Sequence, residues 1–299
     1  AWGVTNATKD TRDWYKIEFK DKNRSAYKYG NEWKPTQVRI EEIKIKGQDT
    51  YLDTVIYTHY GPVVYDRTFK GDRQDVNFAL RWIVHEGSNE QKTFLKLNIA
   101  KNHSDYNAAL DHYSAPAQNF VFASKSGDIA MRIQGKFPLK WPGQGKFFMD
   151  GSDPRMEWQG FIPNDHNAST LNPQRGFVSS ANQHPVDPSY PYYVFDNSYE
   201  HYRNRRLNSK LAEMTQITVE DMKALQFDNF NLQAAEALPT MLNLLGTYQV
   251  ESADADKFVK ELKSWDFFAD PNKKGQTLFT LWFSETMESI WKELMESKA

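Results

Sequence analysis

The chain has 299 residues, and its 37 basic side chains balance 39 acidic ones to a net charge of −2, so no basic excess points to nucleic acid as a partner. It has no cysteine, which excludes disulfides, thiolate metal sites and a cysteine nucleophile within these residues. No apolar run approaches the roughly 18 residues that span a bilayer, so no membrane span is expected.

The first informative stretch runs from residue 2 to residue 13. Residues 2–7, Trp-Gly-Val-Thr-Asn-Ala, favour a β-strand, and Asp10 and Asp13 follow three positions apart. Two carboxylates at this spacing in a loop can share a hard cation such as calcium, with backbone carbonyls completing the shell. A solvated acidic loop is the alternative, and the local pattern alone favours that alternative.

Residues 15–84 are expected to be rich in β-strands. The segment 29–33, Tyr-Gly-Asn-Glu-Trp, has the composition of a hairpin turn. Residues 50–58 and 78–84 predict two further strands. Four apolar residues predict one buried strand face, with a bulge where their spacing slips: Val38, Ile40, Ile43 and Ile45.

A helix is expected over residues 93–101, and Ser104 is expected to cap a short helix over 105–112. Residues 118–123 and 129–133 then predict two strands joined by a Lys-Ser-Gly-Asp turn. Here, as at 29–33, glycine and polar residues mark a turn between two strands.

The segment 176–185, Gly-Phe-Val-Ser-Ser-Ala-Asn-Gln-His-Pro, predicts a short buried strand that delivers Asn182 to its end, with Pro185 stopping the ladder. An asparagine amide at a strand end can donate a hydrogen bond to a negative oxygen that develops on a substrate. Capping of a turn is the alternative role for Asn182, and the local pattern alone favours it.

From Thr218 onward the pattern becomes helical. Residues 218–221, Thr-Val-Glu-Asp, open a helix, and Gly246 closes the helical pattern that continues from there. We therefore expect a β-rich part over residues 1–215 and a helical segment over 216–299 that is truncated at its end.

Several of these motifs together resemble the large subunit of penicillin acylase-type amidases, which are N-terminal-nucleophile hydrolases. The most specific runs are 172–183, Asn-Pro-Gln-Arg-Gly-Phe-Val-Ser-Ser-Ala-Asn-Gln, and 202–207, Tyr-Arg-Asn-Arg-Arg-Leu. The resemblance implies an α+β fold, part of the four-layer αββα arrangement of that class, with a helical C-terminal segment. It implies hydrolysis of a small-molecule N-acyl amide.

The resemblance also implies roles for individual residues. The side-chain amide of Asn182 and the backbone N–H of Asn6 would form an oxyanion hole, and Arg203 would orient the network near the nucleophile. A structural calcium ion would be held by Asp10, the Arg12 carbonyl, Asp13 and the Lys146 carbonyl. The family has a further Asp ligand, and this chain places Tyr192-Tyr193 there.

An acyl pocket is implied at Val4, Thr8, Phe94 and Gln118. Two of these side chains are polar. An unpaired polar group in an acyl pocket costs on the order of 1–3 kcal/mol, so phenylacetyl is not expected as the natural acyl group.

In this family the nucleophile lies several dozen residues before the Trp-Gly motif, which stands here at Trp2. The chain is therefore expected to be a fragment of the large subunit that lacks the nucleophile and is inactive alone. The small subunit and the N-terminal part of the large subunit would be its missing partners. Relatives are usually exported, which implies a periplasmic or secreted protein.

Two other functions remain open. A non-catalytic homologue would use the same fold, with the aromatic stretch 190–202, to bind a ligand. A surface glycan-binding β-domain would draw on the abundant aromatic residues, 19 Phe, 15 Tyr and 9 Trp, but it leaves the order of the motifs unexplained.

Overall fold

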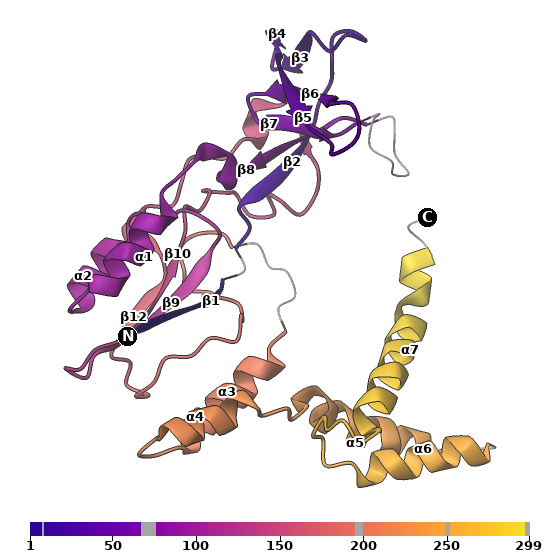
Figure 1. Ribbon diagram of the computed structural model, residues 1–299. Helices are drawn as coiled ribbons and strands as arrows, with labels where there is room; N and C mark the ends of the chain where they lie inside the picture. The colour runs from indigo at the N-terminus through magenta and orange to yellow at the C-terminus, as the bar shows by residue number, and fades with distance from the viewer. Residues whose placement is uncertain (8, 67–75, 195–199, 249–251, 297–299) are drawn as a thin grey trace. The chain divides into compact units, whose positions relative to one another are not determined.

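The structure is a computed structural model, and it describes residues 1–7, 9–66, 76–194, 200–248 and 252–296. The chain divides into two compact units, unit 1 over residues 1–199 and unit 2 over residues 200–299 (Figure 1). The sequence placed a division after residue 215, whereas the helix of residues 202–213 lies in unit 2.

A four-stranded antiparallel sheet with β1 at one edge organises the first part of unit 1. Its strands, in spatial order, are β1 (Trp2–Asn6), β9 (Gln118–Ala123), β10 (Ile129–Gln134) and β12 (Ser169–Leu171). The predicted hairpin of β9 and β10 is confirmed, because Ile129 pairs with Ala123 across the turn.

A second sheet of six strands begins after the short crossover that follows β1. In spatial order the strands are β11 (Met149–Asp150), β2 (Arg12–Lys16), β8 (Phe78–Trp82), β7 (Gly61–Tyr65), β6 (Tyr51–Thr58) and β5 (Gln37–Ile43). Residues 29–33 form the predicted hairpin turn between β3 (Ala26–Tyr29) and β4 (Glu32–Pro35). There Gly30 supplies a positive φ of 55°.

The prediction of a buried face on β5 is wrong. Val38 and Ile40 are 56% and 62% exposed. The expected bulge is absent too, since β5 pairs with β6 in unbroken register from Gln37 to Ile43. The reason is that β5 is the edge strand of its sheet, so an apolar face along it is not necessarily covered by other parts of the chain.

Two helices, α1 (Glu90–Ile99) and α2 (His103–Leu110), pack on one face of the four-stranded sheet (Figure 1). Leu97 and Leu110 bury against Phe120 of β9. The predicted cap at Ser104 is wrong, because Asn102 accepts the capping hydrogen bond from the Asp105 N–H at 2.9 Å. Asparagine competes well for this position, so α2 begins earlier than the sequence indicated. Short 3-10 turns span Ile83–Glu86, Pro154–Met156 and Asn164–His166.

Unit 2 is helical in its described residues. Its helices are α3 (Tyr202–Glu213), α4 (Val219–Gln226), α5 (Leu232–Leu245), α6 (Ala253–Ser264) and α7 (Gly275–Glu296). The predicted cap of α4 is confirmed as a reciprocal capping box between Thr218 and Asp221. Leu238, Trp265 and Phe279 form the centre of its core. Among the described residues, none of the helices has both the length and the apolar character needed to span a bilayer.

Candidate functional site

Asn182 lies in an irregular loop after β12, and the prediction of a short strand that ends at Asn182 is wrong. Gly176 adopts a φ of 76°. The Ser180 hydroxyl forms a hydrogen bond with the Thr5 hydroxyl at 2.6 Å, so this segment is held by a turn and a side-chain hydrogen bond and not by strand pairing. Asn182 itself has a φ of 62°, a left-handed conformation that asparagine tolerates better than most residues. This backbone turns its side chain toward β1.

The Asn182 side chain reaches Asn6 at the end of β1. Its Nδ2 donates a hydrogen bond to the Asn6 backbone carbonyl at 2.9 Å, across 176 positions of sequence. The structure therefore brings together the two residues that the sequence assigned to one oxyanion hole.

The register of β1 decides where the Asn6 backbone points. Antiparallel residue pairs alternate between those that exchange hydrogen bonds and those that do not. The Ala7 N–H donates to the Ala117 carbonyl at 3.1 Å, so Ala7 and Ala117 form a hydrogen-bonded pair. The neighbouring pair, Asn6 and Gln118, therefore exchanges no backbone hydrogen bonds. The N–H and carbonyl of Asn6 consequently point away from β9, toward the open edge of the sheet, where Asn182 lies.

A buried amide, Asn119 of β9, supports this arrangement from the other side. Asn119 is buried, and its Nδ2 lies 3.1 Å from the Asn6 carbonyl, 3.1 Å from Thr5 Oγ1 and 3.0 Å from Ser180 Oγ. One amide thus fixes the end of β1 and the loop before Asn182 together. The sequence pattern did not single out Asn119, although a polar residue directly before the apolar run Phe-Val-Phe-Ala is a recognisable signal.

The predicted acyl-pocket residues are partly brought together. Val4 and Gln118 share the face of the sheet that Phe120 also occupies, and Phe94 packs its ring 6.3 Å from that of Phe120. Gln118 Nε2 donates to the Asn6 side-chain oxygen at 3.1 Å, so the Gln118 amide has a hydrogen-bond partner in the expected acyl pocket. Thr8 lies outside the described residues.

Arg203 lies at the start of α3 in unit 2, where its guanidinium forms an ion pair with Glu200 at 3.0 Å. The Arg203 side chain is largely exposed. Its expected role near a nucleophile stays a prediction.

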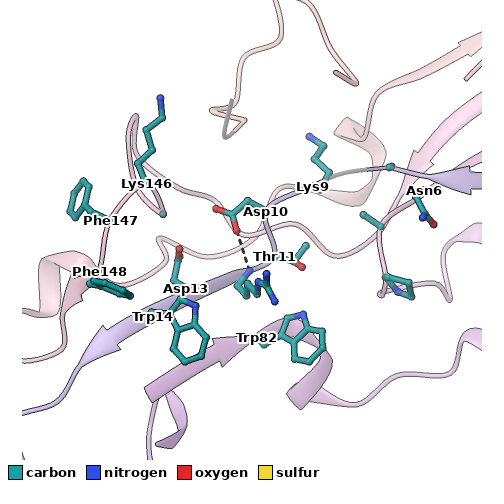
Figure 2. A pocket seen from close by; sticks show the side chains of 15 residues that line it. Asn6, Lys9, Asp10, Thr11, Asp13, Trp14, Trp82, Lys146, Phe147 and Phe148 are labelled. Carbon is teal, nitrogen blue, oxygen red and sulfur yellow. Dashed lines mark hydrogen bonds between the residues drawn. The ribbon is translucent and has the colours of Figure 1, made fainter. Parts of the chain in front are cut away.

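The predicted metal ligands surround one open pocket of about 940 Å³ that also reaches Asn6. Asp10, Arg12, Asp13 and Lys146 all line it. Figure 2 shows the Asp10 and Asp13 carboxyl groups directed to the same region, while the Lys146 ammonium points away from them. Among the described residues, no group of three or more His, Asp or Glu side chains is placed to hold a metal ion.

Lys140, which the sequence analysis missed, already pairs with both carboxylates. Its ammonium lies 2.7 Å from Asp10 Oδ2 and 2.9 Å from Asp13 Oδ2. Burial raises the pKa of the Asp13 carboxyl, and the Lys140 ammonium and the Trp158 indole N–H offset only part of this effect. These residues fit an internal ammonium better than an added calcium ion, and calcium stays a prediction.

Lys9, which lines this pocket, also contacts the first residue of the aromatic stretch 190–202. The Lys9 ammonium lies over the rings of Phe137 and Tyr190, at 5.0 and 5.2 Å from their centroids. The Tyr192 hydroxyl bonds His166 at 2.5 Å. Residues 195–199 lie outside the described residues, and the ligand-binding role of the stretch 190–202 stays a prediction.

Comparison with known proteins adds independent information. A family model described as penicillin amidase matches residues 1–298. The chain is 26% identical over 247 residues to the acyl-homoserine lactone acylase QuiP of Pseudomonas aeruginosa, covering 79% of this chain and 29% of that protein. It is 23% identical over 282 residues to the penicillin acylase 2 proenzyme of Pseudomonas sp., covering 93% of this chain and 35% of that protein. The chain thus spans about a third of the length of these relatives.

Among solved structures, a thermostable penicillin G acylase from Alcaligenes faecalis matches with a TM-score of 0.73 and 20% sequence identity. The match covers 91% of this chain and 49% of that one. This likeness concerns the fold, and it confirms the predicted α+β class and the N-terminal-nucleophile hydrolase fold.

Proposed function

Because the chain belongs to the penicillin amidase family, we propose that the complete protein cleaves the amide bond of an N-acyl small molecule. The acyl group passes to an N-terminal nucleophile and then to water. The observation that carries this proposal is the 2.9 Å hydrogen bond from Asn182 to the Asn6 backbone.

Asn6 and Asn182 act as the oxyanion hole in this proposal. When a nucleophile adds to the amide carbonyl, negative charge develops on its oxygen. The Asn6 N–H is directed to the open edge of the sheet, and the Asn182 amide is held beside the same residue. Donors that are fixed before the reaction need no reorganisation when the charge appears.

The attacking group lies outside these 299 residues. It is the hydroxyl or thiol of an N-terminal Ser, Thr or Cys, released when a precursor cleaves itself. Its proton moves to its own α-amino group, whose unperturbed pKa of about 7.7–8.0 suits a base near neutral pH. That amino group then protonates the leaving amine, and water hydrolyses the acyl-enzyme.

The remaining assignments belong to the same proposal. Val4, Phe94 and Gln118 contribute to the acyl pocket, with Thr8, and Arg203 helps to orient the active-site network. The partners are the small subunit and the N-terminal part of the large subunit. The family resemblance supports export to the periplasm or the medium.

The 299-residue chain alone is expected to release no amine from penicillin G or an N-acyl-homoserine lactone, whereas the complete processed protein hydrolyses at least one N-acyl amide. The reason is that the chain supplies the oxyanion donors but no attacking group. Chromatographic quantification of the released amine, against a buffer blank, checks this. Turnover by the 299-residue chain that Asn182→Ala abolishes would contradict it. A complete protein that binds but never cleaves such amides would support the ligand-binding alternative.

A further inference from the structure

Lys140, Asp10 and Asp13 form a cluster in which the lysine ammonium already occupies the position of a cation between two carboxylates. The Lys140 side chain is only 3% exposed, and the Asp13 side chain is 1% exposed. Each carboxylate offers its Oδ2 to the ammonium, at 2.7 Å from Asp10 and 2.9 Å from Asp13. A buried ammonium with two carboxylate partners is a compensated charge, unlike a lysine that lies on the surface.

Neighbouring residues close the cluster. Trp158 Nε1 donates to Asp13 Oδ2 at 2.5 Å, and the Lys140 ammonium lies 5.8 Å from the centroid of the Trp158 ring. Gly145, with a φ of 92°, passes so close that an added Cβ would lie 2.4 Å from Asp10 Oδ2 and 3.2 Å from Lys140 Nζ. Gly145 therefore closes one side of the cluster, while Asp10 and Asp13 also line the open pocket described above.

A calcium ion does not fit this arrangement. Calcium takes six to eight oxygen ligands at about 2.3–2.6 Å. One oxygen of each carboxylate, Oδ2, is already in contact with Lys140. A dication there would also stand beside a positive charge in a buried setting, where repulsion between like charges is least screened.

The position of the cluster explains what it does for the fold. Asp10 lies in the crossover between β1 and β2, and Asp13 lies in β2. Lys140 comes from the segment after β10, whose neighbour Leu139 exchanges two backbone hydrogen bonds of 2.9 Å with residues 159 and 160. The ammonium thus ties the crossover that follows Asn6 to a separate, hydrogen-bonded segment of unit 1.

We propose that the Lys140 ammonium is the permanent cation of the Asp10–Asp13 pair and takes the structural place of a metal ion. The complete protein is then stable without calcium. This inference does not rest on the proposed hydrolase function, because its test measures unfolding and not turnover.

The first experiment compares thermal unfolding of the complete wild-type protein in excess EGTA and in excess CaCl2. The expected result is an equal Tm, within about 1 °C, because a ligand that does not bind the folded state adds no stability. A Tm that rises by several degrees with calcium, but not with the same concentration of MgCl2, overturns the proposal.

The second experiment compares Lys140→Met with Lys136→Met in the complete protein. Lys136 is a matched control, because it also pairs with a carboxylate, that of Glu86, but at an exposed site. Lys140→Met is expected to lower the Tm by several degrees and Lys136→Met by little, since only the first leaves buried carboxylates without a cation. Equal losses in the two variants overturn the proposal. If Lys140→Met does not fold, the wild-type comparison still decides the question.

Discussion

Replacing Asn182 with alanine is expected to lower the kcat of the complete, processed protein by about 10²–10³-fold. The KM is expected to change little, because the amide acts on charge that exists only in the transition state. Steady-state kinetics on an N-acyl amide substrate, normalised to the number of acylated active sites, measures both quantities.

Asn172→Ala is the matched control for this variant. Asn172 also has a positive φ, of 47°, and it also bonds a backbone group, the Ile129 N–H at 2.9 Å. Alanine suffers similar backbone strain at both positions, but only Asn182 contacts Asn6. A similar loss of kcat in both variants, or a loss of less than about threefold in Asn182→Ala, would show that Asn182 only shapes the loop.

Replacing Asp13 with alanine is expected to cost about 3–5 kcal/mol of unfolding free energy, the usual result of removing one partner from a buried ion pair. Asp13 is almost fully buried, and it accepts hydrogen bonds from both Lys140 and Trp158. The variant leaves the Lys140 ammonium with Asp10 alone. Denaturant unfolding of the complete protein, followed by fluorescence, measures the change.

Two further variants show whether this cost comes from the ion pair. Asp153→Ala removes an ion pair with the exposed Arg155 side chain and is expected to change stability little. The double variant Asp13→Ala with Lys140→Met is expected to lose clearly less than the sum of the single losses, because the charges disappear together. Additive losses in the double variant would mean that Asp13 and Lys140 do not interact.

Local patterns predicted the fold best where the responsible residues are neighbours in sequence. The hairpin of β9 and β10 depends on the turn 125–128, and the cap of α4 depends on Thr218 and Asp221. Burial was predicted less well. The apolar positions of β5 have the right spacing for a strand, but the sequence does not reveal that β5 is an edge strand.

The candidate site shows the same limit. The resemblance singled out Asn182 and Asn6, and the structure places them in contact although the predicted strand before Asn182 is an irregular loop. Lys140 was missed because it lies 130 positions from Asp10, and its apolar neighbours Leu139 and Trp141 do not reveal which carboxylates it meets. Only the fold reveals that its charge is buried between two carboxylates.

The most direct test of the central claim is to identify the first residue of the large subunit in the complete, purified protein. Intact-mass measurement and N-terminal sequencing provide this. The account predicts a cleaved protein whose large subunit begins with Ser, Thr or Cys, upstream of Trp2, as an N-terminal-nucleophile amidase requires. An uncleaved chain, or a new terminus without a nucleophilic side chain, would contradict the account and leave Asn182 as a turn residue.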